Sequence, residues 1–241
     1  MNLLKKNNFF LRLIRKIDSP KIQFNLNRST AVVEIVGPPC SGKTTLLHEL
    51  KASLGLKYYY DSDFFKVSNA DVPVSIVSES YNKLFFQELD YAYRNVKETD
   101  VLIRSSIFRS KIMLSDFILS TCYCEKPFLI SEGMIHSFSN AIYASLINDN
   151  YDAIKIFSNR KVIFIDVARD VIKSNLSKRL SSSSVSGYTY DSLTGAFLDD
   201  KIDAAIKKYS SIVECIEKFG GDVFFYKSDS DIELLKKFIG S

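Results

Sequence analysis

Short apolar runs alternate with longer stretches of helical apolar spacing along most of this chain. Runs rich in β-branched and aromatic residues, bounded by polar residues, glycine or proline, are typical of buried strands. Five such runs predict strands at 31–36, 56–60, 127–133, 161–167 and 222–228. Apolar residues at helical spacing predict helices at 44–54, 78–98, 105–123, 134–149, 168–180, 199–219 and 230–240.

Strands that alternate with helices indicate βαβ crossovers, because parallel neighbours need a long connection. The pattern therefore predicts an α/β fold in three layers, with a five-stranded parallel sheet and helices on both faces. Ligands of such folds bind beyond the carboxyl ends of the strands. The first three strands each end in a polar cluster, at 37–45, 61–63 and 131–133, so three segments direct their chemistry to one edge.

The first of these clusters, GPPCSGKTT, has the spacing Gly37-x-x-x-x-Gly42-Lys43-Thr44 of a phosphate-binding loop. Glycines let successive backbone N–H groups surround an anion, and the following helix adds its N-terminal dipole. We expect Lys43 to reach the β- and γ-phosphates, Thr44 to ligate Mg²⁺ and Thr45 to support the α-phosphate. The alternative is a glycine-rich turn with an incidental lysine. The predicted nucleotide-binding residues are Gly37, Pro38, Pro39, Cys40, Ser41, Gly42, Lys43, Thr44 and Thr45.

The composition limits the classes of protein that this chain can represent. With 241 residues, 46% of them hydrophobic and 25% charged, it is long enough for one well-buried α/β domain. The net charge of +4 is too small to indicate a nucleic-acid partner. Four cysteines without metal-ligand spacing, and only two histidines, favour reduced thiols in a cytoplasmic protein without zinc. No apolar run reaches the roughly 18 residues of a membrane-spanning helix, and cations interrupt any signal-peptide pattern.

The strand, glycine loop and helix at 31–54 resemble the P-loop NTPase family. The sequence has no Asn-Lys-x-Asp motif of the kind with which GTPases recognise the base. Its length, and a late basic helix followed by a serine-rich segment, resemble the nucleoside, nucleotide and small-metabolite kinases. The resemblance implies ATP and Mg²⁺ as cofactors, a kinase domain over 29–241, and a lid at about 178–198 that closes over ATP.

The lid and the base site are also implied by resemblance. KVIFIDVARDVIKSNLSKR is similar to the fourth strand and lid helix of that kinase group, so Arg179, with Lys178 or Arg169, is expected to contact the ATP phosphates. The alternative is that these cations simply favour a helix C-terminus. FFYKSDSDIELL resembles the last strand and the loop beside adenine, which implies that 228–230 line the base.

PFLISEG occupies the position of the second acidic motif of these kinases. A carboxylate there holds Mg²⁺ through water, which makes Glu132 the predicted metal-site partner of Thr44. The alternative is a strand-end glutamate in solvent.

The segment YYYDSDFF resembles the Asp-Ser-Asp or Asp-Gly-Asp segment of shikimate and gluconate kinases, which bind the acceptor hydroxyl there. An aspartate can accept the hydroxyl proton and orient the oxygen for in-line attack. On this resemblance Asp63 is the predicted base and Asp61 a second substrate-binding carboxylate. The alternative is a plain turn, because Asp and Ser are turn formers.

The basic residues of 104–111 offer a contact for an anionic acceptor such as a carboxylate, a phosphosugar or a nucleotide. RSSIFRS resembles the acidic-Arg-Ser motif of deoxynucleoside kinases, although the acidic residue is missing. Arg104 is the predicted substrate contact, with Arg109 and Lys111 beside it. A solvated helix face is the other interpretation.

Residues 1–28 form a basic, amphipathic extension before the first strand. Its apolar residues are interspersed with cations, as in helices that lie on an anionic membrane surface. Peripheral contact of residues 1–20 with the inner face of the membrane is one interpretation. A helix packed on the domain or on a partner subunit is the other.

The predicted function is an ATP-dependent kinase that transfers the γ-phosphoryl group to a hydroxyl of a small metabolite, which would be a sugar derivative, a cyclitol or a nucleoside or nucleotide. Lys43, Asp63 and Arg179 would be its catalytic residues. Two alternatives stay open: a switch that hydrolyses ATP, and a non-catalytic nucleotide-binding module in a larger complex.

Overall fold

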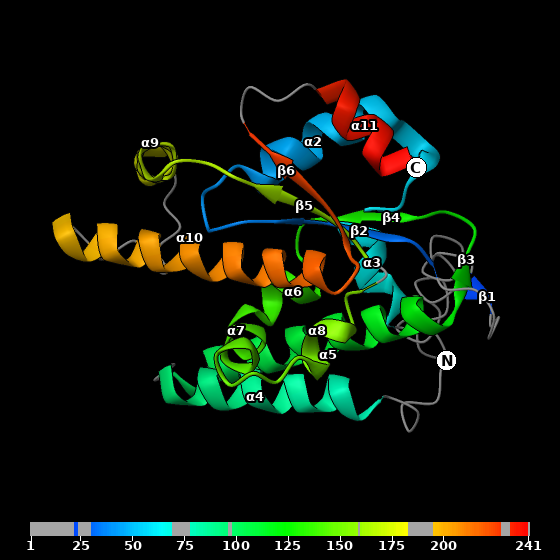
Figure 1. Cartoon of the computed structure of the whole chain (residues 1–241), viewed down its shortest axis with the longest axis horizontal. Coiled ribbons are helices and arrows are strands. Elements are labelled where there is room, and N and C mark those ends of the chain that lie inside the picture. Colours follow the sequence, from blue (N-terminus) through cyan, green and yellow to red (C-terminus); the bar gives the residue numbers. More distant parts are fainter. Residues whose placement is uncertain are drawn as a thin grey trace, which may run out of the picture.

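The computed structural model describes residues 22–23, 30–68, 78–95, 98–158, 160–182, 195–227 and 232–240. Within these residues four parallel strands form the main sheet, in the order β4-β2-β5-β6, and helices cover both of its faces (Figure 1). The strands are β2 (Val32–Val36), β4 (Phe128–Ile130), β5 (Lys161–Ile165) and β6 (Asp222–Tyr226). The predicted α/β class, with a parallel sheet between helical layers, is confirmed.

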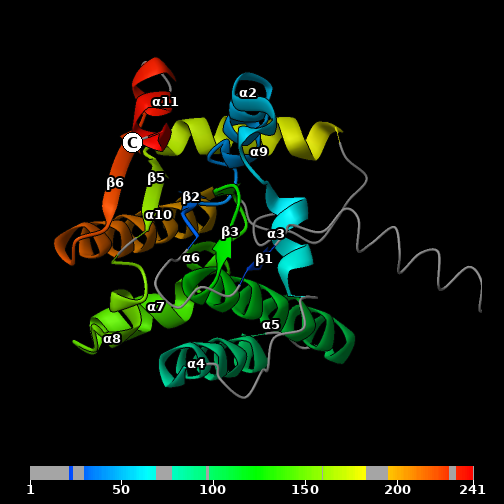
Figure 2. The ribbon, with the colours of Figure 1, turned by 90° about the vertical axis from the view of Figure 1, so that its right-hand side faces the viewer.

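Helices lie between successive strands of the main sheet, as the pattern of the sequence predicts, and several consecutive helices separate β2 from β4. The helices are α2 (Lys43–Leu54), α3 (Asp61–Val67), α4 (Glu79–Asn95), α5 (Thr99–Thr121), α6 (Met134–Ser137), α7 (Ser139–Ile147), α8 (Asp152–Lys155), α9 (Arg169–Ser182), α10 (Gly195–Lys218) and α11 (Ile232–Gly240), with a 3₁₀ turn η1 (Gly55–Lys57). Figure 2 shows α2 and α11 on one side of the sheet, and α4, α5, α7 and α10 on the other.

All the residues of β2 are buried. Since successive side chains of a strand point to opposite sides, both faces of β2 are therefore covered. Val33 and Ile35 pack with Leu50 of α2 and Leu235 of α11. Val32 and Val36, on the opposite face, join the larger core that includes residues of α5, α7 and α10. This double burial fixes the direction of β2, and so the place where the loop that follows it emerges.

The predicted five-stranded sheet is wrong, because 56–60 does not form a strand. Tyr59 makes an isolated parallel bridge to Phe128, in which its N–H donates to the Pro127 carbonyl at 2.9 Å and its carbonyl accepts from the Leu129 N–H at 2.8 Å. The turn η1 precedes this bridge and α3 follows it almost at once. The segment is therefore extended beside β4 over too few residues to pair as a strand.

Part of the N-terminal extension is tied to the domain. β1 (Ile22–Gln23) pairs antiparallel with β3 (Tyr123–Cys124), which follows α5. Residues 1–20, on which the membrane interpretation depends, lie outside the described residues. None of the described helices combines the length and the apolar character needed to span a membrane.

A buried ion-pair network joins the sheet to the helices below it. The Arg160 guanidinium donates to Glu34 of β2 at 2.9 Å and to Asp116 of α5 at 2.5 Å, and the Tyr81 hydroxyl donates to Asp116 at 2.8 Å. Burial raises the pKa of Glu34 to about 7, although the Arg160 charge opposes that shift. The second oxygen of Glu34 accepts the His136 backbone N–H at 3.0 Å, so this network also holds the start of α6.

Candidate phosphate-binding site

The loop between β2 and α2 favours glycine at two positions, by backbone conformation at one and by close packing at the other. Gly42 adopts φ 102°, in the left-handed region that favours glycine, directly before α2 begins at Lys43. A Cβ on Gly37 would lie 2.8 Å from the Ser41 hydroxyl oxygen and 3.4 Å from Ile165. The strand, tight loop and helix N-terminus have the arrangement of a phosphate-binding loop.

Lys43 folds back over this loop. Its ammonium donates to the carbonyl oxygens of Gly37 at 2.8 Å and Pro38 at 2.9 Å. Burial lowers the pKa of Lys43 to about 8, while the nearby Cys40 and Glu132 act in the opposite direction. The ammonium is therefore charged at neutral pH, and it lies at the loop where the β- and γ-phosphates are expected.

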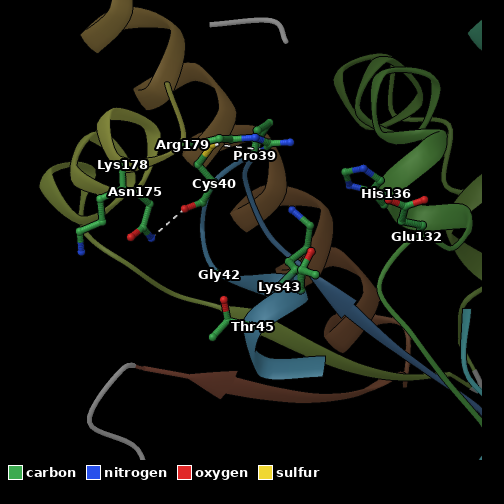
Figure 3. Close-up of a pocket in the computed structure, with 11 residues that line it drawn as sticks. Pro39, Cys40, Gly42, Lys43, Thr45, Glu132, His136, Asn175, Lys178 and Arg179 are labelled. Carbon is green, nitrogen blue, oxygen red and sulfur yellow. Dashed lines mark hydrogen bonds between the residues drawn. The ribbon is translucent and has the colours of Figure 1, made fainter. Parts of the chain in front are cut away.

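A cavity of about 570 Å³ opens beside the loop. It is lined by the loop, by the end of β4 and the start of α6, and by α9. In Figure 3 Lys43 lies between two walls, with Glu132 and His136 on one side and Asn175, Lys178 and Arg179 on the other. The lining residues are Pro39, Cys40, Gly42, Lys43, Thr44, Thr45, Glu132, His136, Asn175, Lys178 and Arg179.

Helix α9, at the start of the predicted lid, is attached to the loop through Cys40. The Asn175 amide donates to the Cys40 carbonyl at 3.0 Å, and the Arg179 guanidinium lies 4.0 Å from the Cys40 sulfur. Arg179 and Lys178 both face the cavity. Arg169 does not line it and instead pairs with Asp203 of α10.

Two carboxylates meet at the end of β4. Asp61, the first residue of α3, accepts hydrogen bonds from the Ser131 N–H at 2.8 Å, the Ser131 hydroxyl at 2.9 Å and the Glu132 N–H at 3.3 Å. Glu132 projects into the cavity (Figure 3). Desolvation and the charge of Asp61 raise the pKa of Glu132, and Lys43 opposes this.

The donor set suits a magnesium ion that is shared with phosphates. The Thr44 hydroxyl and the Glu132 carboxylate both line the cavity and offer the hard oxygen ligands that Mg²⁺ prefers. Among the described residues no group of three or more His, Cys, Asp or Glu side chains is placed to hold a metal by itself. Mg²⁺ bound here would therefore take its remaining ligands from phosphate oxygens and water.

Neither Asp61 nor Asp63 lines the cavity, although the sequence predicts Asp63 as the base and Asp61 as a substrate contact. The carboxylate of Asp63 accepts the Tyr60 backbone N–H at 3.3 Å and the Lys66 ammonium at 3.3 Å, both close to it along the chain. These contacts cap the first turn of α3. The arrangement brings Asp61, and not Asp63, to the end of β4.

The basic residues of α5 also lie apart from the cavity lining. Arg104 is solvent-exposed, and Arg109 donates to the Ser137 carbonyl at 3.3 Å and pairs with Glu88 of α4 at 3.5 Å. Glu88 is buried and also accepts the Ala141 N–H at 2.9 Å. Arg109 therefore has a structural partner, and the role of Arg104 stays a prediction.

A smaller hollow of about 280 Å³ continues from the loop toward β6. It shares Gly42, Thr45 and Asn175 with the larger cavity and is closed by Tyr226 and Val167. Its lining is mixed, with apolar side chains from Leu46, Ile165, Val167 and Val171 and polar ones from Ser41, Thr45, Glu49, Asn175 and Tyr226. Residues 228–230, predicted to line the base, lie outside the described residues.

His136 and Asn175 line the cavity, but the sequence analysis did not identify either of them. His136 lies in the short helix α6, three residues beyond Gly133, and no sequence motif marks it. A Cβ on Gly133 would lie 2.5 Å from the Glu34 carboxyl carbon, so the close packing of this turn on β2 brings His136 to the cavity. Only the chain's small number of histidines could have drawn attention to it.

Comparisons with known proteins find likenesses among solved structures. No protein-family model matches the sequence, and no curated protein sequence matches it significantly. Among solved structures, a deoxyadenosine kinase from M. mycoides with the products dCMP and a flexible dCDP bound is similar over 87% of this chain and 96% of that chain, at 14% sequence identity and a TM-score of 0.42. A likeness at this level does not identify the family of this chain.

Proposed function

We propose that this chain binds ATP with Mg²⁺ and transfers the γ-phosphoryl group to a hydroxyl of a small metabolite, a sugar derivative, a cyclitol or a nucleoside. The observation that supports this is the shared cavity. A glycine loop with its lysine, a hydroxyl and a carboxylate for Mg²⁺, and two cations of α9 all line one space of about 570 Å³. Phosphoryl transfer requires mainly such positioning and neutralisation of charge.

Each group has a role in this proposal. The loop N–H groups and Lys43 hold the phosphates, and Thr44 and Glu132 organise Mg²⁺. Arg179, with Lys178, balances the negative charge that spreads over the transferred group. The hollow toward β6 takes the nucleoside of ATP.

We assign the acceptor hydroxyl to Asp61 in preference to Asp63. Asp61 is hydrogen-bonded to Ser131 and Glu132 at the edge of the sheet, whereas the carboxylate of Asp63 caps its own helix. A carboxylate fixed by backbone N–H groups is well oriented to accept the hydroxyl proton as the oxygen attacks the γ-phosphorus. The bond to the β-phosphate oxygen then breaks, and ADP leaves.

The test is a screen of sugars, cyclitols and nucleosides for ADP release in the presence of Mg²⁺ and ATP, with Lys43→Ala as the inactive control. ADP release that depends on one acceptor class supports the kinase. Hydrolysis that no small molecule stimulates favours the ATP-hydrolysing switch. Tight ATP binding without any transfer favours the non-catalytic module. If the protein has no magnesium-dependent affinity for ATP, the proposal is wrong.

A further inference from the structure

His136 stands at one end of the cavity and has no part in the roles assigned above. It lies four residues beyond Glu132, on the wall that α6 forms at the end of β4. In Figure 3 its ring extends from that wall toward the space beside Lys43, facing the side from which α9 supplies Arg179.

Tyr209 of α10 holds the imidazole in place. The Tyr209 hydroxyl lies 3.3 Å from Nδ1 of His136, and the two rings are nearly parallel, at 13°, with centroids 6.4 Å apart. The backbone N–H of His136 is bound to Glu34, as described above, so both the main chain and the ring are fixed. A side chain held in this way is ready to meet a ligand without reorganisation.

The ring is uncharged when the cavity holds no anion. Burial lowers the pKa of His136 to about 3, and the charges of Lys43, Lys208 and Arg109 act in the same direction. A neutral imidazole carries one proton, and its position depends on the partner of the other nitrogen. The single proton of the Tyr209 hydroxyl can go to Nδ1 or to Ser139 Oγ, which lies 3.4 Å away, and donation to Nδ1 leaves the ring proton on Nε2 as a neutral donor.

The strand order determines which end of a nucleotide approaches this ring. β6, which closes the smaller hollow, and β4, which leads to His136, are the two edge strands of the sheet, and β2 with its loop lies between them. A nucleotide whose base lies toward β6 and whose phosphates cross the loop therefore points its last phosphate toward α6.

We propose that His136 Nε2–H donates a hydrogen bond to the γ-phosphoryl group of bound ATP, so that this site discriminates a triphosphate from a diphosphate. The inference rests on the proposed function, since it assumes that a nucleotide occupies the loop. The hydrogen bond from His136 would be a catalytic contact on the wall opposite α9. It would add selectivity for a triphosphate over a diphosphate to the binding that Lys43 and the loop provide.

The experiment compares Mg²⁺–ADP with the Mg²⁺ complex of the non-hydrolysable β,γ-imido analogue of ATP, by calorimetric titration. His136→Asn should weaken binding of the imido triphosphate at least tenfold and change ADP affinity less than twofold. His136→Gln, whose amide reaches the position of Nε2, should recover part of the loss. His48→Asn is the matched control, because His48 is the other histidine and is exposed on α2.

A second readout uses the unmodified protein and does not depend on how the variants fold. In ¹H–¹⁵N spectra of the two imidazoles, with signals assigned from His48→Asn, the His136 Nε2 signal should move with the imido triphosphate and not with ADP. Equal losses for both nucleotides in His136→Asn, or no selective movement of this signal, would overturn the inference. Binding of neither nucleotide to the unmodified protein would instead reject the proposed function, and this inference with it.

Discussion

The carboxylate of Asp61 accepts two hydrogen bonds from Ser131, at 2.8 Å from its backbone N–H and at 2.9 Å from its hydroxyl. These residues are 70 positions apart, and their contact joins the start of α3 to the end of β4. It places one carboxylate beside Glu132, which lines the cavity. The contact therefore brings Asp61, and not Asp63, next to a residue of the cavity wall.

Asp61→Asn should abolish most phosphoryl transfer and keep the fold. The amide oxygen can still accept the two backbone N–H groups, and its NH₂ can donate to the Ser131 hydroxyl, but the side chain can no longer accept a proton. We expect turnover of the acceptor found by screening to fall about 100-fold or more. Nucleotide affinity, measured by titration with Mg²⁺–ADP, should change little.

Asp63→Asn is the matched comparison for that variant. It removes a helix-capping charge and the pair with Lys66, so we expect a loss of roughly 1 kcal/mol in the free energy of unfolding. Turnover should stay within a few-fold of the unmodified protein. A large loss of turnover in Asp63→Asn, with none in Asp61→Asn, would show that Asp63 and not Asp61 acts as the base.

Nucleotide affinity should decline at alkaline pH. The pKa of Lys43 is lowered to about 8 in the free protein, and a bound phosphate favours the charged ammonium, so binding is linked to proton uptake. The affinity for Mg²⁺–ADP should be nearly constant from about pH 6.5 to 7.5 and fall above about pH 8, by up to tenfold per pH unit. Titration at constant ionic strength measures this. An affinity that stays flat to about pH 9.5 would contradict it.

Thr44→Val should remove the magnesium dependence of nucleotide binding. The hydroxyl of Thr44 is the proposed protein ligand of Mg²⁺ at the loop, and valine has the same shape without the oxygen. We expect affinity with Mg²⁺ to fall to the value found with a chelator. Thr44→Ser keeps the hydroxyl and should keep the dependence. Equal magnesium effects in the valine variant and the unmodified protein would show that Thr44 is not a ligand.

Arg160→Met should destabilise the fold, because it leaves Glu34 and Asp116 buried without their cation. We expect a loss of about 3–5 kcal/mol at neutral pH, measured by urea unfolding. Burial already raises the pKa of Glu34, and removal of the Arg160 charge that opposes this shift would raise it further. A carboxyl with a raised pKa contributes most stability below the unfolded pKa and loses it as pH rises through the folded one, so the loss should be smaller near pH 5.

The control for Arg160→Met is Lys155→Met, which breaks the exposed ion pair with Asp152 at 3.0 Å. Solvent screens such a pair, and we expect a change below about 0.5 kcal/mol with little dependence on pH. If Arg160→Met lowered the free energy of unfolding as little as Lys155→Met, the core would tolerate the loss of the Arg160 cation, and the expectation would be wrong.

The sequence by itself determined the loop and most of the layers around it. The proposed phosphate loop from Gly37 to Thr45 can be predicted because the conformation that presents backbone N–H groups to an anion is local, and glycine spacing encodes it. The alternation of strands and helices followed from apolar periodicity, which is also local. This reasoning failed at 56–60, since apolar aromatic residues favour a strand but cannot say how many of them will find a partner. It also missed α3, α8 and the short strands β1 and β3, and it predicted one helix at 134–149 where α6 and α7 form.

The tertiary structure alone decided which polar groups meet. Asp61 and Asp63 are the same type of residue in the same short segment, so residue type does not show which of them contacts Ser131. Asp61 makes that contact because α3 begins beside β4. His136 reaches the cavity because Gly133 packs against Glu34, a contact between residues about a hundred positions apart. Such contacts depend on long-range packing of buried elements, and local propensity carries no information about them. The glycine loop could therefore be predicted from the sequence, whereas the arrangement of Glu132 and His136 on the facing wall of the cavity could not.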